Sequence, residues 1–278
     1  MTGNTLPTPG DLTPQNFQFL QDHVYRRSGI VLGADKDYLL QARLAPIVTE
    51  QRLETLNDLC ALLRSTRDEL LQQNVVEAMT TNETLFFRDP RVWQGLKTVV
   101  QEIMEIRQTT RTIRIWSAAS SSGQEAYSLV MMLLELGLGD WNLQVLGTDL
   151  STKMVQRARE GKFSQLEVNR GLGASYLIKY FTRDGLGWQV NGPVRYRARF
   201  ELLDLRKPLN LPGPFDLVLC RNVLIYFDLP TRTRIIDQIR TTLYRGAHLV
   251  LGSSETAIHP DCAFAPRAIG PVTFYQAR

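Results

Sequence analysis

Apolar residues recur at helical spacing through the first third of the chain. Thr13-Pro14 marks a helix start, the apolar positions that follow share one face, and Gly29 marks its end. The same spacing predicts helices near 36–52 and 56–64. Because no β-rich run interrupts these patterns, residues 13–80 are predicted to form a small all-α domain.

Three local signals refine this domain. Thr66 and Glu69 have the spacing of a capping box, which predicts a fourth helix ending near Met79. Pro46 predicts a kink or a break in the second helix, because proline removes a backbone donor. Residues 1–12 are rich in proline, glycine and threonine and are expected to form a loose tail.

Strands and helices alternate in the second part of the chain. Residues 81–108 are interpreted as a linker followed by a helix, and 109–278 as an α/β domain. Strands are predicted at 113–119, 143–149, 215–220 and 247–252, and helices at 123–137, from Ser151 onward and at 231–244. Such alternation favours a doubly wound, mostly parallel sheet with helices on both faces.

A β insertion is predicted at about 185–203. Trp188–Val190 and Val194–Phe200 read as an antiparallel ribbon that turns at Asn191-Gly192-Pro193. Alternation along the second strand places three arginines on one face, which is either a solvated face or a docking surface: Arg195, Arg197 and Arg199.

Composition narrows the class of protein. The net charge is only +4, but residues 151–210 hold twelve Lys and Arg against five Asp and Glu, so a basic region is available to an acidic partner. Three scattered cysteines and three scattered histidines give no metal-ligand spacing, so no metal site is expected. With neither a signal peptide pattern nor an apolar run of about 20 residues, the protein is expected to be cytoplasmic, without direct membrane insertion.

The linker between the two domains combines polar and aromatic side chains in one short segment. Within residues 82–90, Phe86-Phe87 can anchor the segment in apolar surface, while Asn82, Thr84 and Arg88 can meet a polar ligand. A helix cap made by Asp89 and Pro90 is the competing interpretation, but it explains only the last two residues.

The loop after the first strand, residues 120–125, points to the class of ligand. Ligands of doubly wound sheets bind beyond the carboxyl ends of the strands. A pyrophosphate requires close backbone approach at several glycines, and this loop has only Gly123. Glu125 in the first helical turn would repel a phosphate and attract an ammonium. The loop therefore favours an adenosyl ligand without phosphates over a dinucleotide.

Asp149 ends the second strand, where a carboxylate can accept hydrogen bonds from both hydroxyls of a ribose. Capping of the next helix is the alternative for Asp149, although Ser151 is the nearer candidate. Asp204-Leu205 can meet an adenine ring, or Asp204 can be a loop residue beside Arg206-Lys207.

Arg221-Asn222 follows the third strand directly and is placed at the same sheet edge. Tyr226 comes about one turn later and is either a site residue or a core residue with its hydroxyl at the surface.

Five segments in register give the chain a specific resemblance. It resembles the CheR-type chemoreceptor glutamate methyltransferases in NETLFFRDP (82–90), IWSAASSSGQEAYSL (115–129), LGTDLS (146–151), PGPFDLVLCRNVLIYFD (212–228) and GSSE (252–255). The resemblance covers the whole chain, including the helical domain and the β insertion. It implies a Rossmann-like methyltransferase domain that uses S-adenosylmethionine to convert receptor glutamates to γ-methyl esters and leaves S-adenosylhomocysteine as product.

The resemblance also implies a set of site residues. Two of them, Arg88 and Tyr226, are expected nearest the transferred methyl, as catalytic residues. The cofactor contacts that it implies are Asn82, Thr84, Arg88, Glu125, Asp149, Asp204, Leu205, Arg221 and Asn222. A glutamate side chain, with a pKa near 4.3, is already ionised at neutral pH and needs no general base. Aligning it with the sulfonium methyl is then the main catalytic task.

The sequence departs from the family pattern at two places, one in the first loop of the α/β domain and one in the helical domain. The first loop reads Gly123-Gln124-Glu125 where the family commonly has Gly-Glu-Glu. The second helix, usually strongly basic and thought to dock the receptor, has few cations between Arg43 and Arg52 and contains a proline. Docking by that helix is therefore less well supported than cofactor binding.

The implied partners are chemoreceptor cytoplasmic domains, with a receptor C-terminal tail peptide as a candidate ligand of the β insertion, and the enzyme is expected to be a monomer. A regulatory protein that binds S-adenosylmethionine without turnover is the alternative function, and the presence of Arg88 and Tyr226 weighs against it. A nucleic-acid methyltransferase is disfavoured, since the chain lacks an Asn/Asp-Pro-Pro-aromatic motif.

Overall fold

Two compact units make up the structure, a computed structural model that describes residues 12–257 and 262–278. One unit contains the chain up to residue 81 together with 226–228, and the other contains 82–225 and 229–278. Residues 1–11 of the predicted tail lie outside the described range.

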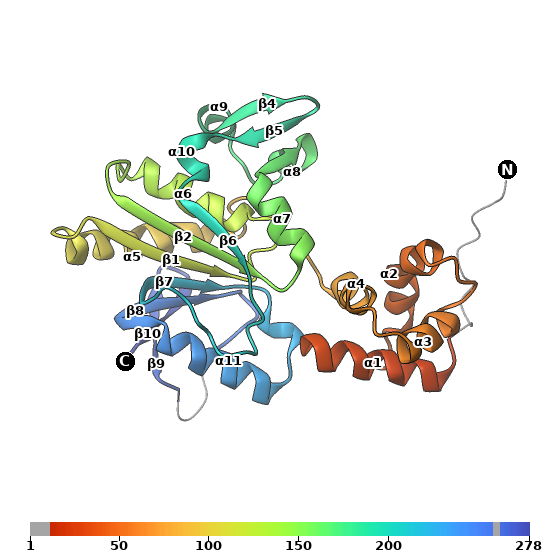
Figure 1. The fold of residues 1–278 in the computed structure, drawn as a ribbon. Helices are drawn as coiled ribbons and strands as arrows, with labels where there is room; N and C mark the ends of the chain where they lie inside the picture. The colour runs from red at the N-terminus through yellow and green to blue at the C-terminus, as the bar shows by residue number, and fades with distance from the viewer. Residues whose placement is uncertain (1–11, 258–261) are drawn as a thin grey trace. The chain divides into compact units, whose positions relative to one another are not determined.

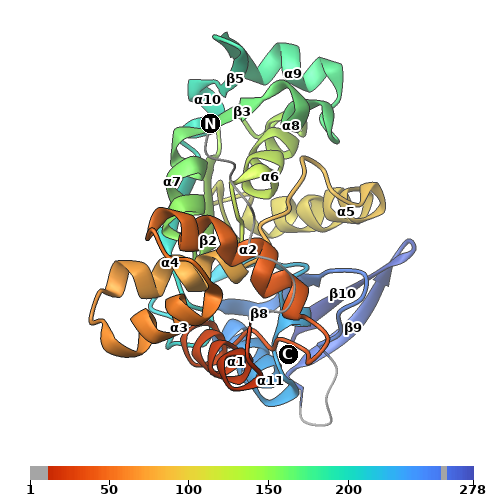
Figure 2. The ribbon, with the colours of Figure 1, turned by 90° about the vertical axis from the view of Figure 1, so that its right-hand side faces the viewer.

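The first unit is all-helical, as the apolar spacing predicts. Its core consists of buried leucines and valines from every helix, including Leu20, Leu44, Leu59 and Val75. Figure 2 shows its helices lying close together. They are α1 (Pro14–Ser28), α2 (Asp37–Glu50), α3 (Leu56–Ser65) and α4 (Glu69–Met79).

The helix ends agree with the sequence signals at α1 and differ at α4. The Thr13 side chain caps α1, and Gly29 ends it in the left-handed region with φ 76°. The predicted capping box at Thr66 is wrong, because Asp68 stands next to the first helical residue and its carboxylate accepts the N–H groups of α4. Pro46 lies inside α2, which continues without a break to Glu50.

Arg43 has a structural task in this unit. Its guanidinium donates to the carbonyl oxygens of Met79 and Thr80, at 2.9 and 3.1 Å, and to the Thr81 hydroxyl. The last carbonyls of a helix have no partner within the helix and carry a partial negative charge. Arg43 therefore satisfies the carboxyl end of α4.

The second unit is built on a seven-stranded sheet with the order β6-β2-β1-β7-β8-β10-β9 (Figure 1). Pairing is parallel from β6 to β8, and β10 pairs antiparallel with both β8 and β9. This confirms the predicted Rossmann-like α/β class. The strands are β1 (Thr112–Ala118), β2 (Asn142–Asp149), β6 (Ala198–Leu202), β7 (Phe215–Cys220), β8 (Leu243–Leu251), β9 (Phe264–Ile269) and β10 (Val272–Ala277).

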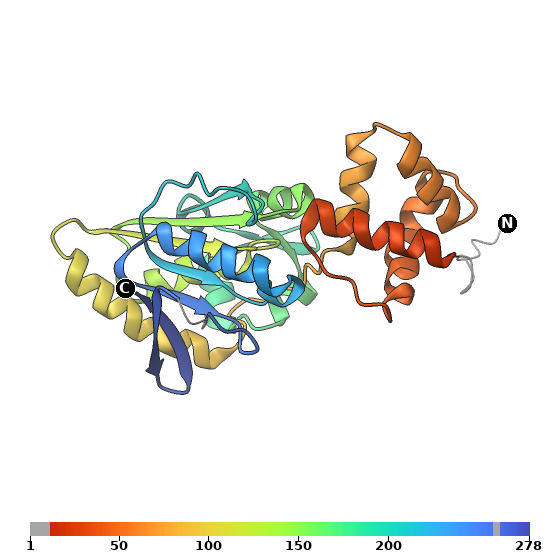
Figure 3. The same ribbon diagram turned by 90° about the horizontal axis from the view of Figure 1, so that it is seen from below.

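Apolar-rich sequences explain why β1 and β7 are central strands. Every residue of β7 is buried, and Ile113, Ile115 and Trp116 of β1 are fully buried, as expected for parallel strands covered on both faces. Figure 3 shows α11 lying across the sheet with the β9–β10 hairpin extending beside it. The helices of this layer are α5 (Pro90–Arg107), α6 (Gln124–Glu135), α7 (Thr152–Glu160) and α11 (Leu229–Thr241), with a short 3-10 turn η1 (Leu224–Tyr226).

The chain segment that connects β2 to β6 forms a small, separate antiparallel sheet with the strand order β3-β5-β4. Its strands are β3 (Lys162–Ser164), β4 (Phe181–Asp184) and β5 (Gly187–Val190). Three short helices accompany it: α8 (Gln165–Asn169), α9 (Ala174–Tyr180) and α10 (Gly192–Arg195). The insertion is therefore present, but its strands pair differently from the prediction.

The predicted ribbon between Trp188–Val190 and Val194–Phe200 does not form. The hairpin turn is at Gly185, with φ 57°, and joins β4 to β5. Pro193 sits in the first turn of α10, a position that suits its fixed φ, and β6 then joins the main sheet parallel to β2. The three arginines therefore do not share one ribbon face: Arg195 is helical, Arg197 follows the helix and Arg199 is in β6.

Candidate active site

The loops that follow β1, β2 and β7 lie at the carboxyl edge of the sheet, where doubly wound folds bind ligands. The linker reaches the same edge. The Ser121 hydroxyl donates to the carbonyl oxygen of Asn82 at 2.8 Å, and the Phe87 N–H donates to the Ser128 hydroxyl at 3.1 Å. The linker therefore lies beside the first loop and the helix that follows it.

Backbone strain concentrates at this edge. Seven non-glycine residues of the described chain have positive φ, and five of them are in these loops: Phe87, Asp89, Ala119, Ser121 and Asn222. Gly123, with φ 92°, ends the first loop in a conformation that a side chain would make costly. Such conformations cost free energy and gather at sites where a ligand demands a particular backbone shape.

Asp149 is 8% exposed at the end of β2 and is held by the backbone. Its two carboxylate oxygens accept the N–H of Ser121 at 2.8 Å and the N–H of Ser151 at 2.9 Å. Ser151, and not Asp149, caps α7 by accepting the N–H of Met154. Asp149 therefore ties two loops together and is not a helix cap.

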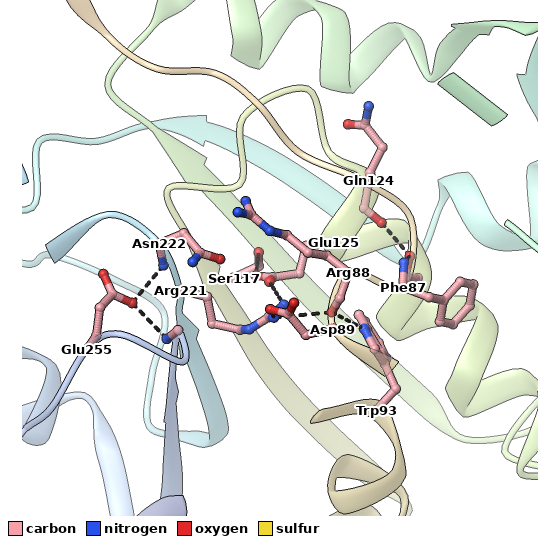
Figure 4. A network of polar contacts seen from close by, with 12 residues as sticks. Phe87, Arg88, Asp89, Trp93, Ser117, Gln124, Glu125, Arg221, Asn222 and Glu255 are labelled. Carbon is pink, nitrogen blue, oxygen red and sulfur yellow. Dashed lines mark hydrogen bonds and ion pairs between the residues drawn. The ribbon is translucent and has the colours of Figure 1, made fainter. Parts of the chain in front are cut away.

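An ion-pair network around one buried guanidinium links the linker to the sheet (Figure 4). The Arg221 side chain is 2% exposed and pairs with the carboxylates of Glu125, at 2.9 Å, and Asp89. Its guanidinium also donates to the carbonyl oxygen of Arg88 at 3.1 Å. The other Glu125 oxygen accepts from the Ser117 hydroxyl at 2.8 Å.

The network engages two carboxylates within the protein. Of the two Glu125 oxygens, one accepts from the Ser117 hydroxyl and the other from the Arg221 guanidinium. Asp89 precedes α5, yet its side chain accepts no N–H of that helix among the described residues and binds Arg221 instead. Opposite charges in a low dielectric attract strongly, which explains why two carboxylates turn toward one buried guanidinium.

The aromatic pair of the linker anchors it, as expected. Phe86 is fully buried, with its ring edge-on to Phe163 and Phe181. Phe87 packs against Trp93 and Tyr176.

Arg88 is held by its backbone, because its carbonyl oxygen accepts the indole N–H of Trp93 at 2.8 Å. Among the residues that the structure describes, its guanidinium makes one long contact, at 3.3 Å, with the Glu83 carbonyl oxygen. Asn82 and Thr84 are partly buried on the same linker. The side chain of Arg88 is therefore less committed to the protein than that of Arg221.

Asp204 follows β6 and pairs with Arg206, through Nε at 2.9 Å and Nη2 at 2.7 Å. The Asp204 carboxylate is therefore held in place by Arg206. Leu205 next to it is buried.

Tyr226 belongs to the helical unit. Its carbonyl oxygen accepts the N–H of Val31 at 2.9 Å, and its ring packs against the helical core.

Glu255 is the residue that sequence reasoning missed. Its carboxylate accepts five backbone N–H groups, from Asn222, Val223, Leu224, Ile225 and Gly252, at 2.7 to 3.3 Å. It thereby fixes the loop that carries Arg221 and Asn222 (Figure 4). The only signal in the sequence was its place in the segment 252–255, to which no role was attached.

Cys220 ends β7 beside this network but is not a nucleophile. Burial raises the pKa of its thiol well above the ordinary value, and the nearby charges of Glu255 and Glu125 raise it further. Thiolate is the reactive form, so Cys220 remains a protonated, inert thiol at neutral pH.

The second unit is thus an α/β domain with a strained, acid-rich loop cluster at its carboxyl edge, the arrangement of a Rossmann-like methyltransferase. The description "CheR methyltransferase, SAM binding domain" matches residues 82–266, and "CheR methyltransferase, all-alpha domain" matches residues 15–80. The chain belongs to the CheR methyltransferase family.

Named relatives agree with this assignment. Chemotaxis protein methyltransferase 1 of Pseudomonas aeruginosa is 40% identical over 270 residues, which cover 95% of this chain and 98% of the relative. Chemotaxis protein methyltransferase Cher2 of Pseudomonas putida is 36% identical over 272 residues, with the same coverage. A TehB-like SAM-dependent methyltransferase structure from Corynebacterium glutamicum is 15% identical, with a TM-score of 0.38 over 66% of this chain and 85% of that one, and adds no weight.

Within the described residues, no helix is long and apolar enough to cross a membrane. Nor does the described part of the chain contain a cluster of three His, Cys, Asp or Glu side chains able to hold a metal ion.

Proposed function

We propose that this protein methylates glutamate side chains of membrane-bound chemoreceptors, using S-adenosylmethionine. The observation that carries the proposal is the match of the SAM-binding family model to residues 82–266, where the polar loop cluster lies. The names of the relatives, chemotaxis protein methyltransferases, support a receptor as the substrate.

The residues at the carboxyl edge suit the proposed cofactor. Asp149 offers a rigid carboxylate to ribose hydroxyls, because its position is fixed by two backbone N–H groups. Leu205 supplies apolar surface for an adenine, while Asn82, Thr84, Asp204 and Asn222 supply polar groups around it. Glu125 and Arg221 act as a pair that shapes the site, since each already neutralises the other.

Arg88 is the proposed catalytic cation. When bound, the cofactor supplies an electrophilic methyl group. Arg88 then orients the incoming glutamate carboxylate, which is ionised without help at neutral pH. Its guanidinium has a planar set of donors that matches a carboxylate, and its backbone is fixed by Trp93. Tyr226 is proposed to share this positioning role through its hydroxyl.

The proposed partners are chemoreceptor cytoplasmic domains, met by a monomeric enzyme in the cytoplasm. A receptor tail peptide has a candidate place at the small sheet, since β3 and β4 are its outer strands and a peptide can add to a free edge. The basic excess of residues 151–210, which include this sheet, favours acidic partners.

Labelled cofactor tests the proposal directly. The protein is incubated with S-adenosylmethionine labelled in its methyl group and with purified receptor cytoplasmic domains. Label that enters a receptor and is released by mild base identifies a methyl ester. If the protein binds the cofactor but transfers no label to any receptor, it is the regulatory binding protein of the alternative hypothesis.

Changing Tyr226→Phe is expected to reduce turnover more than cofactor affinity. The hydroxyl would contribute when the carboxylate is aligned in the transition state and would be idle in the binary complex. Turnover with saturating receptor and calorimetry with S-adenosylhomocysteine separate the two effects. Tyr38→Phe, at a tyrosine that is 57% exposed in the same unit, is the control. Normal turnover in the Tyr226 variant would leave that ring with a packing role only.

A further inference from the structure

The loop after β7 is held at its backbone by a single carboxylate. The Oε2 atom of Glu255 accepts the N–H groups of Asn222 and Gly252, each at 2.7 Å. Its Oε1 atom accepts the N–H groups of residues 223–225, at 2.7 to 3.3 Å. Hydrogen bonds to an ionised acceptor are roughly twice as strong as those between neutral groups. The conformation of the loop therefore depends on one side chain that lies 33 residues after Asn222 in the sequence.

Asn222 combines a strained backbone with an uncommitted side chain. Its φ is 59°, in the left-handed region that residues other than glycine adopt at a cost. Its side-chain amide forms no hydrogen bond with any residue that the structure describes, although the residue is partly buried. The two donors and the acceptor of this amide are therefore available to a ligand.

Gly252, directly after β8, allows the two residues to approach each other. A Cβ atom at this position would lie 2.6 Å from Oε2 of Glu255 and 2.8 Å from Nδ2 of Asn222, closer than such atoms pack in proteins. Figure 4 shows the Glu255 carboxylate directed at the backbone of Asn222. The bonds to Asn222 and Gly252 thus join the carboxyl ends of β7 and β8, which are parallel neighbours in the sheet.

We propose that Glu255 is a positioning residue for the cofactor, which it does not touch. It holds the Asn222 backbone in its strained conformation, so that the free amide of Asn222 is already oriented toward the bound cofactor. The role rests on the proposed function, in which the cofactor binds at this sheet edge. Without the carboxylate, five N–H groups lose their acceptor, and the Asn222 backbone relaxes to an ordinary conformation that turns the amide away.

A double-mutant cycle tests whether Glu255 acts through Asn222. Glu255→Gln keeps the size of the side chain but sets an NH2 group against backbone donors. Asn222→Gly removes the amide and suits the positive φ. Each single change is expected to lower the affinity for S-adenosylhomocysteine about tenfold, measured by titration calorimetry. The double variant should also lose about tenfold, and not about a hundredfold, because a side chain that is absent cannot be misplaced.

Glu167→Gln is the matched control. The Glu167 carboxylate accepts the N–H and the hydroxyl of Ser164 and pairs with Arg157, at the start of α8. Its change should lower the stability in urea unfolding but leave the affinity for S-adenosylhomocysteine within about twofold of wild type. Circular dichroism sets the temperature of the titrations, so that every variant is folded.

Gly252→Ala perturbs the same contact without removing a polar group, because the added methyl group presses on Glu255 and Asn222. It should weaken the binding of S-adenosylhomocysteine in the wild-type background and have little further effect in the Asn222→Gly background. This second cycle gives the answer if Glu255→Gln does not fold.

The failure of this role and the failure of the proposed function give different results. Additive losses in the cycles, about a hundredfold for Glu255→Gln with Asn222→Gly, would mean that Glu255 acts independently of Asn222, and would overturn the positioning role while cofactor binding stands. Normal affinity in Asn222→Gly or in Glu255→Gln would overturn it as well. Wild-type protein that binds neither S-adenosylmethionine nor S-adenosylhomocysteine would overturn the proposed function, and the positioning role with it.

Discussion

Asp149→Ala is expected to lower the affinity for S-adenosylhomocysteine about ten- to a hundred-fold, measured by titration calorimetry. The carboxylate is buried and fixed by Ser121 and Ser151, so in the proposed cofactor site it would meet a ribose without further ordering. A hydrogen bond to a charged acceptor contributes roughly 1.5 to 3 kcal/mol, which corresponds to this change in affinity. The affinity for S-adenosylmethionine should fall by the same factor, because the ribose is common to both ligands.

Asp149→Asn provides the graded comparison. It keeps the size and one acceptor oxygen, so its loss of affinity should lie between those of wild type and Asp149→Ala. Asp140→Ala, at an exposed carboxylate in the turn before β2, should bind as wild type does. If Asp149→Ala binds both ligands normally, Asp149 serves only to join the two loops and has no place in the cofactor site.

The regular part of the fold was predictable because each element has a strong local signal. Short apolar-rich segments that alternate with helical patterns identified β1, β2, β7 and β8, and helical spacing with Thr13 and Gly29 placed α1. The strand pairing of the insertion was not predictable in the same way. Asn191-Gly192-Pro193 and Asp184-Gly185 are both acceptable turns, and only the distant partners β3 and β2 decide between them.

The same limit applies to the candidate site. Its residue types and sheet edge could be predicted, since carboxyl ends of parallel strands converge. The ion pairs that these residues form with one another could not be predicted. Arg221 is far from Glu125 in sequence, and nothing local indicates that its guanidinium would occupy both Glu125 and Asp89. Glu255 was missed for a related reason: its five partners are backbone N–H groups, which leave no trace in side-chain chemistry.

Arg221→Met is expected to destabilise the protein by about 3–5 kcal/mol, the usual cost of removing one partner of a buried ion pair. The change would leave Glu125 and Asp89 without their shared cation, and most of the cost would come from Glu125, which is 13% exposed, because Asp89 is 41% exposed and partly solvated. It would also remove the bond from Arg221 to the carbonyl oxygen of Arg88, which helps to hold the proposed catalytic arginine. Urea unfolding measures the first effect and calorimetry with S-adenosylhomocysteine the second.

Arg107→Met is the control that distinguishes a role of Arg221 in the candidate site from a general contribution to stability. Arg107 pairs with the buried Asp216 at 2.7 Å, near the opposite, amino-terminal end of β7, so its loss should also destabilise. At temperatures where both variants are folded, Arg107→Met should bind the cofactor product normally and Arg221→Met should not. Adding Glu125→Gln to Arg221→Met should restore part of the stability, because it removes one of the uncompensated charges. If the two arginine variants bind S-adenosylhomocysteine equally well, the Arg221 network supports the sheet and does not shape the site.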